Sequence, residues 1–380
     1  MHSIGLYIHF PFCLRKCNYC DFPSFQGMDE WITPYINALC RELQEWKGKL
    51  TDYRVQTIYL GGGTPTLIPA EQIAYVLNLC TSIFHVEDDA EITIEANPGT
   101  VSKEQLSVLK DSGVNRLSIG LQAWQERHLK TLGRIHRNKD LLYSVDFARD
   151  AGLYNISIDV MFGLPGQTVD EWLETLYRVC MLGIEHVSTY SLKVEEGTLL
   201  YTWLNRGLIS LPTQEEDRSM YYRGRDYLHQ HGLEQYEISN FAVPGRECIH
   251  NLIYWNNGEY IGFGSGAHSF FNKERFSNYK GIKKYIDAVM TGSKRTEFRE
   301  RIDEVNERFE TIMLGLRLVK GISKKSFMER FGRDIYYYYG EAIKKLEEKN
   351  LLIDDGRQIR LTTRGMDVQN TVLLEFMGLN

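Results

Sequence analysis

Three cysteines close to the N-terminus form the most chemically specific pattern in the sequence. Cys13, Cys17 and Cys20 are spaced as C-x3-C-x2-C, directly after an apolar run. Thiolates are soft ligands that suit zinc or iron–sulfur clusters. A structural zinc site usually takes four ligands, and the sequence has no second cysteine pair to supply them. The pattern therefore favours a [4Fe–4S] cluster with one iron open to an outside ligand, with zinc and incidental loop cysteines as the alternatives.

The remaining cysteines give no sign of a disulfide framework. The chain holds 7 cysteines, an odd number, and Cys40, Cys80, Cys180 and Cys248 are dispersed. The N-terminal apolar stretch has no basic region before it and does not read as a signal peptide. These features predict a reducing, cytoplasmic setting.

Polar motifs follow or end several of the later apolar runs. Glycines such as Gly62 and Gly63 allow backbone amides to approach a ligand closely. An acidic residue within an apolar strand, such as Asp159, is costly unless it is paired or functional. The motifs are Gly61–Pro65, Glu95–Pro98, Gln122 and Asp159 with the following Gly163–Gly166. Their recurrence at successive run ends predicts one shared site.

Short apolar runs alternate with helical patterns over the first half of the chain, and this alternation must position those motifs. The runs cover residues 4–10, 55–61, 91–96, 116–122, 155–163 and 186–192; helical stretches cover 31–47, 69–84, 102–112, 138–151 and 168–182. Such repeats give parallel strands with right-handed crossovers. We expect an α/β barrel, partial or full, or a doubly wound sheet, with the motifs at the carboxyl ends of the strands.

The sequence divides into three predicted parts: an α/β core over 1–192, a less regular extension over 193–290, and a smaller C-terminal α+β domain over 291–380. The last part is helical from about residue 295 and has a hairpin pattern over 351–362, as in a winged helix. The net charge of −6 argues against broad charge-driven binding to nucleic acid. The sequence contains no run of 18 apolar residues, so no membrane span is predicted.

The cysteine spacing, with the aromatic Tyr19 inside it, resembles the radical S-adenosylmethionine (SAM) superfamily. The resemblance implies a partial (β/α)6 barrel in which the open iron binds the amino and carboxylate groups of SAM. In that superfamily an electron from the cluster cleaves SAM to a 5′-deoxyadenosyl radical. The residues that it assigns to SAM are Tyr7, Tyr19, Gly62, Gly63, Thr64, Glu95, Gln122, Arg134 and Asp159.

The resemblance also suggests individual roles for these residues. Tyr19 would lie near the adenine, and the glycine motif would bind the SAM amino group. Glu95 and Gln122 would bind the ribose or the carboxylate region. Arg134 would bind the carboxylate, and Asp159 would contact the ribose side or a second SAM.

Over nearly the whole chain the sequence is similar to the coproporphyrinogen dehydrogenase branch, and within it to HemW-type heme chaperones. The similar segments are YIHFPFC, GGGTPT, EANP, GLQ, DVMFGLPGQT and QYEISNFA. Phe22 stands where the dehydrogenase typically has a fourth cysteine, and only 12 residues precede Cys13, where the dehydrogenase has a long extension. His250–Trp255 matches the H-N-x-x-Y-W motif that is implicated in heme binding.

The resemblance implies a heme chaperone that binds heme through His250 and transfers it to acceptors such as respiratory enzymes. It also implies an electron donor for the cluster, a monomer or cluster-dependent homodimer, and no coproporphyrinogen dehydrogenase activity. The alternatives are an oxygen-independent coproporphyrinogen III dehydrogenase, a radical SAM methyltransferase that opens heme, and a scaffold that does not cleave SAM. By itself, a histidine beside Tyr and Trp is more often structural. Cys248 and His250 do not form a C-x-x-C-H motif, so no thioether link is expected.

Overall fold

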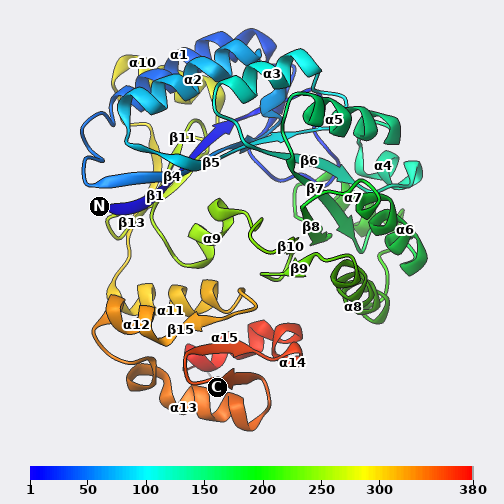
Figure 1. Cartoon of the computed structure of the whole chain (residues 1–380), viewed down its shortest axis with the longest axis vertical. Coiled ribbons are helices and arrows are strands. Elements are labelled where there is room, and N and C mark those ends of the chain that lie inside the picture. The colour runs from blue at the N-terminus through cyan, green and yellow to red at the C-terminus, as the bar shows by residue number, and fades with distance from the viewer. Residues whose placement is uncertain (379–380) are drawn as a thin grey trace.

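A curved sheet of parallel strands forms the centre of the molecule, of which the computed structural model describes residues 1–378 (Figure 1). The six predicted strands are confirmed, and they lie side by side in chain order. They are β1 (His2–Phe10), β4 (Tyr53–Gly62), β5 (Val86–Ala96), β6 (Arg116–Gln122), β7 (Asn155–Phe162) and β8 (His186–Ser191). An unreversed order is that of a barrel rather than a doubly wound sheet, and the sheet stays open, so the barrel is partial.

Helices between these strands cover the outer face of the sheet (Figure 1). They are α1 (Ile32–Gln44), α2 (Ala70–Ile83), α3 (Lys103–Asp111), α4 (Glu126–Leu132), α5 (Asn138–Asp150) and α6 (Val169–Cys180). Local signals start several of them: the Ser102 hydroxyl caps α3, and Thr168 forms a capping box with Glu171 on α6. The short 3-10 helices η1 (Asp29–Trp31) and η2 (Pro65–Leu67) precede α1 and α2.

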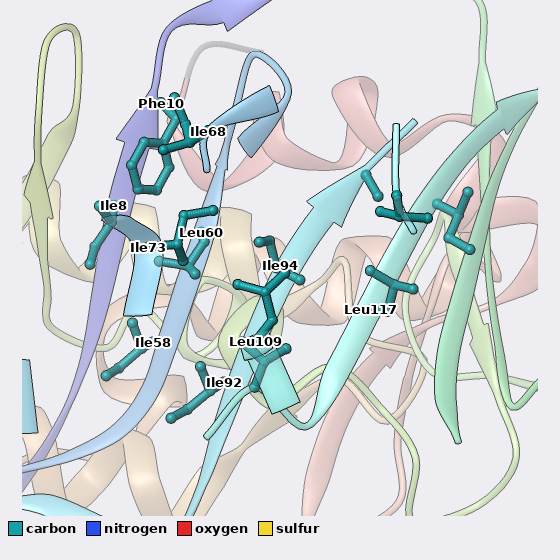
Figure 2. Close-up of a cluster of buried hydrophobic side chains, with 14 of the residues drawn as sticks. Ile8, Phe10, Ile58, Leu60, Ile68, Ile73, Ile92, Ile94, Leu109 and Leu117 are labelled. Carbon is teal, nitrogen blue, oxygen red and sulfur yellow. The ribbon is translucent and has the colours of Figure 1, made fainter. Parts of the chain in front are cut away.

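The hydrophobic core lies between the sheet and these helices. Figure 2 shows strand residues such as Ile58, Leu60 and Ile94 beside Ile73 of α2 and Leu109 of α3, and each of these five side chains is fully buried. Strand side chains alternate between the two faces of a sheet. The residues between the core positions, such as Tyr59 and Glu95, therefore face the inner side, where they line a cavity.

The segment over 193–290 adds strands to both ends of the sheet. Its elements are α7 (Leu199–Asn205), α8 (Gln214–Gln230), β9 (Glu234–Gln235), β10 (Asn240–Ala242), α9 (Ile249–Trp255), β11 (Tyr260–Phe263), β12 (His268–Phe271), β13 (Glu274–Asn278) and α10 (Ile282–Thr291). Strand β11 pairs in parallel with β1, whereas β10 pairs antiparallel with β8. Helix α9 lies on the inner side of the curved sheet, in contact with β1 and β4 (Figure 1).

The start of the C-terminal part corrects one expectation. A helical pattern was predicted from about residue 295, but Thr296–Arg301 forms strand β14, which pairs antiparallel with β13. Its residues are mostly exposed, so the strand is stabilised by pairing with a neighbour and not by burial. Such pairing leaves no helical or apolar signature in the segment itself.

A separate core holds the remaining elements together. They are α11 (Glu304–Gly315), β15 (Ile322–Ser323), α12 (Lys324–Phe331), α13 (Ile335–Glu348), β16 (Leu352–Asp354), β17 (Gln358–Leu361), α14 (Thr363–Asp367) and α15 (Gln369–Phe376). Strands β16 and β17 form the predicted hairpin, and β15 adds a third strand, which gives the expected small α+β unit. Buried residues of this core include Ile312, Phe327, Ile343 and Phe376. No helix within residues 1–378 combines the length and the apolar character that crossing a membrane requires.

Candidate cluster and cofactor site

The cysteine loop follows β1 and is closed by a short parallel pair, β2 (Phe12–Cys13) with β3 (Phe25–Gln26). All three thiols line one cavity of about 440 Å³ at the carboxyl ends of the barrel strands. Within residues 1–378, no three His, Cys, Asp or Glu side chains converge closely enough to hold a single metal ion. A cubane cluster makes a different demand, because each thiolate ligates a different iron and the three thiols need only line one cavity. Cys13, Cys17 and Cys20 therefore fit a cluster with an open iron.

The same cavity collects nearly all of the residues that were predicted to bind SAM. Besides the cysteines, its lining includes Tyr19, Gly62, Gly63, Thr64, Glu95, Gln122, Arg134 and Asp159. These residues come from six segments that are distant in sequence, and the parallel strands bring them together. A cavity with several convergent polar groups is the usual form of a small-molecule site. Tyr7 is the exception, because it does not line this cavity.

The glycine turn after β4 is tied directly to the cluster loop. The amides of Gly63 and Thr64 donate to the carbonyl oxygens of Phe10 and Phe12, each over 2.8 Å. A Cβ at Gly63 would lie 2.5 Å from the Phe12 oxygen, so only glycine allows this close approach. The turn therefore has a structural reason for its glycines as well as a place beside the cofactor cavity.

Two buried carboxylates stand on the inner side of the sheet. Glu95 accepts hydrogen bonds from the Tyr59 hydroxyl over 2.9 Å and from the Gly62 amide over 3.0 Å. Burial raises the pKa of Glu95 to about 7, against the opposing effect of these hydrogen bonds. Asp159 accepts from the Ser118 hydroxyl over 3.0 Å, and burial raises its pKa as well. The carboxyl group of Glu95 can therefore exchange a proton near neutral pH, more readily than an exposed glutamate.

Arg134 lies at the rim of the cavity beside Cys17, and Gln122 lines the same cavity. Arg134 donates from Nη2 to Asn97 Oδ1 and to the Gly120 oxygen, each over 2.5 Å, and from Nη1 to Cys17 Sγ over 3.6 Å. Gln122 adopts a φ of 73°, where β6 shifts register against β7. A non-glycine residue in the left-handed region costs energy, and such residues cluster at functional sites. The irregularity at Gln122 thus coincides with a predicted ligand position.

Tyr7 and His250 lie together in a second cluster, away from the cysteines. His250 is 1% exposed, and its Nδ1 and Nε2 are hydrogen bonded to Thr57 Oγ1 over 2.6 Å and to the Tyr254 hydroxyl over 2.8 Å. Its ring stacks on Tyr59 with 5.1 Å between centroids, and the ring of Tyr7 lies 6.2 Å from that of Tyr59 and 6.5 Å from that of His250, so the three rings form one group. Burial lowers the pKa of His250 to about 3, so the imidazole is neutral. Tyr59 joins this cluster to Glu95.

Several residues that line the cavity were not predicted from the sequence, and four of them come from the inner strand positions and from α9. Tyr59, Arg116 and Ser118 occupy inward-facing strand positions, and Asn251 extends the cavity to α9. The alternation along β6 places Arg116, Ser118, Gly120 and Gln122 on one face. The sequence therefore contained a signal for Arg116, because the alternation places this charged residue on the same strand face as Gln122.

Comparisons with known proteins agree with this architecture. Residues 7–179 match the radical SAM superfamily, and residues 302–368 match the HemN C-terminal domain. The heme chaperone HemW of Bacillus subtilis is 39% identical over 98% of both chains, and that of Lactococcus lactis is 35% identical over 98% of this chain and 96% of the other. The structure of coproporphyrinogen III oxidase (HemN) from Escherichia coli has the same fold, with a TM-score of 0.85, 22% identity, and 99% and 90% of the two chains covered. The chain belongs to the HemW family of the radical SAM superfamily.

Proposed function

We propose that this protein is a heme chaperone that binds a [4Fe–4S] cluster, SAM and heme, and passes heme to acceptor proteins. The observation that carries the proposal is similarity to proteins named heme chaperone HemW over almost the whole chain. The cavity supports it, because the cysteines and the polar strand-end residues line one space. The acceptors would be proteins such as respiratory enzymes, and an electron donor would serve the cluster in the cytoplasm.

Different cavity residues would bind the cluster and the separate parts of SAM. Cys13, Cys17 and Cys20 would hold the cluster, and the open iron would supply a binding position for SAM. Around it, the glycine turn would offer backbone amides, and Arg134 would offer a cation to the carboxylate. Tyr19 would cover the adenine, while Glu95, Gln122 and Asp159 would accept or donate hydrogen bonds to the ribose side. Tyr7 does not line the cavity, so it would act indirectly, through Tyr59, on which it stacks, or through His9, to which its hydroxyl is hydrogen bonded.

The proposed parts of the chain would have separate tasks: 1–192 would hold the cluster and SAM, 193–290 would supply the heme motif, and 291–380 would form the smaller domain. The heme motif is carried by α9, and Asn251 of that helix lines the cofactor cavity. Heme bound near His250 would therefore lie within reach of the cluster site.

Coordination of heme iron by His250 would require a change in the hydrogen bonds that this side chain now makes. A neutral imidazole is a good axial ligand, and the lowered pKa of His250 keeps it neutral. Both ring nitrogens already have partners, so coordination of iron must replace the hydrogen bond to Thr57 or that to Tyr254. Heme binding is thus expected to change the surroundings of α9.

An anaerobic heme titration of reconstituted protein tests the proposal, with wild type compared with His250→Ala and His186→Ala. His186 is a matched control, because it is fully buried and its nitrogens are hydrogen bonded to Ser157 over 2.8 Å and Tyr236 over 2.9 Å. We expect saturable one-to-one binding in wild type and His186→Ala, and a weakened or spectrally altered complex in His250→Ala.

Other outcomes of the titration have equally clear meanings. Absence of heme binding by wild type with an intact cluster would contradict the chaperone function, and an anaerobic assay for protoporphyrinogen formation would then test the dehydrogenase. Equal binding by all three proteins would mean that heme binds away from His250, while the chaperone function would still be supported. Equal weakening in both variants would mean that a loss of barrel packing, and not loss of an iron ligand, causes the effect.

A further inference from the structure

Arg116 is a buried guanidinium that points into the cofactor cavity without a partner. It begins β6, its side chain lines the cavity of about 440 Å³, and only 2% of the residue is exposed. Its Nε atom has no hydrogen-bond partner. Within residues 1–378, no carboxylate lies close enough to form an ion pair with it. A buried charge with unfilled donors is costly, so the position calls for an explanation.

The carboxylates on the same face of the sheet are satisfied by other donors. Glu91, Glu95 and Asp159 lie near enough to Arg116 to interact with its charge, although none forms an ion pair with it. Glu91 accepts from the amides of Ile249 and His250, each over 3.0 Å, Glu95 accepts from Tyr59 and Gly62, and Asp159 accepts from Ser118. The unfilled hydrogen-bonding capacity of this region therefore belongs to the cation and not to the acids.

The chemistry of the free group limits what it can bind. A guanidinium keeps its charge in proteins and presents its donors in a planar fork. That fork matches a carboxylate, which can accept two parallel hydrogen bonds. Around Arg116 the cavity offers the small polar side chains of Ser118 and Ser188, which leave room for such a group.

We infer that Arg116 binds a carboxylate of the ligand that occupies the cavity. The inference deepens the proposed function and rests on it, because both proposed ligands carry this group. The single carboxylate of SAM is already assigned to the open iron and Arg134, so the two propionates of heme are the first candidates and the SAM comparison tests the other source. The site is distinct from the rim, where Arg134 lies beside Cys17.

The test compares each ligand with a form that lacks the carboxylate. Equilibrium binding to the cluster-loaded protein is measured for SAM against decarboxylated SAM, and for heme against heme dimethyl ester. We expect wild type to prefer the carboxylate form of one ligand by about tenfold. Arg116→Gln should remove that preference and leave the affinity for the carboxylate-free form nearly unchanged. The pair that shows the preference identifies the source of the carboxylate.

Two further variants separate recognition from folding. Arg116→Lys keeps the charge but loses the fork, so it should retain only part of the preference. Arg295→Gln is the control, because Arg295 is partly buried but pairs with Glu42 and Glu45 outside the cavity. It should leave the preference intact.

Three results would overturn the inference: no preference by wild type in either pair, a preference that survives Arg116→Gln, or equal weakening of both forms by that variant. Absence of heme binding together with a SAM preference that depends on Arg116 would refute the chaperone function and uphold the inference. If Arg116→Gln fails to fold, the preference of wild type for the carboxylate form and its partial loss in Arg116→Lys still test the inference.

Discussion

Arg134 donates a hydrogen bond from Nη1 to Cys17 Sγ over 3.6 Å and so joins the segment after α4 to the cluster loop. The guanidinium also donates to Asn97 and Gly120, which fixes its position at the rim of the cavity. A cation held beside a thiolate ligand stabilises negative charge on the cluster that this thiolate would bind. The contact therefore links the protein scaffold to the electronic properties of the proposed cluster.

Arg134→Gln is expected to lower the reduction potential of the reconstituted cluster, because the reduced cluster carries one more negative charge. It should also weaken SAM binding by about tenfold through loss of a charge-assisted hydrogen bond. A redox titration followed by electron paramagnetic resonance measures the potential. Arg134→Lys keeps the charge and should restore part of the shift; an unchanged potential in Arg134→Gln would contradict the prediction.

Gly63→Ala is expected to disrupt the cluster loop. The added Cβ would lie 2.5 Å from the Phe12 oxygen and 2.8 Å from the Phe10 oxygen, and backbone atoms cannot move aside easily. We expect a loss of about 2–4 kcal/mol in the free energy of unfolding and a reduced iron content after reconstitution. Gly340→Ala is the control: its nearest neighbours would be 3.7 Å away, so stability should change by less than about 1 kcal/mol.

Glu95→Gln is expected to flatten the pH dependence of stability. Burial raises the pKa of Glu95 from 4.5 to about 7, so the folded protein binds this proton more tightly than the unfolded chain does. The stability contributed by the protonated form is complete below about pH 4.5 and is lost as the pH rises through about 7, which amounts to about 3 kcal/mol.

Urea denaturation of the cluster-free protein at several pH values between 4.5 and 8 measures this effect. The free energy of unfolding of wild type should fall more steeply with rising pH than that of the Glu95→Gln protein. Parallel curves for the two proteins would show that Glu95 keeps an ordinary pKa.

Arg317→Met is expected to destabilise the contact between the C-terminal domain and the barrel. Arg317 Nη2 donates over 3.0 Å to Glu237 Oε2, and the Glu237 side chain is fully buried. Removing one partner of a buried pair leaves an uncompensated charge, at a cost of about 3 kcal/mol. Chemical denaturation should show this loss, and the double variant Glu237→Gln with Arg317→Met should recover part of it.

Lys325→Met provides the comparison for that experiment. The ion pair of Lys325 with Glu329 has side chains that are 84% and 65% exposed. Exposed pairs contribute little, so stability should change by less than about 0.5 kcal/mol. Equal effects of the two substitutions would mean that the Glu237 carboxylate does not depend on Arg317.

Local sequence patterns were sufficient to predict the six barrel strands, five of the helices between them and the cysteine loop, whereas the short helix α4 was not predicted. Strand and helix periodicity, caps such as Ser102, and ligand spacing are properties of short segments, so each can be recognised without knowledge of the partner. The parallel direction of the strands followed from the strand–helix alternation, and it was enough to predict that Glu95, Gln122 and Asp159 share one edge of the sheet. The order of the strands, which distinguishes a barrel from a doubly wound sheet, came only from the structure.

Long-range pairing accounts for what the sequence did not reveal. Strand β14 is stabilised by its neighbour β13, and β11 pairs with β1, which is distant from it in sequence. The hydrogen bonds of His250 come from Thr57 and Tyr254, and the unpartnered state of Arg116 depends on which donors reach each nearby carboxylate. Such contacts depend on how side chains distant in sequence meet inside the barrel, so they cannot be predicted from local sequence preferences.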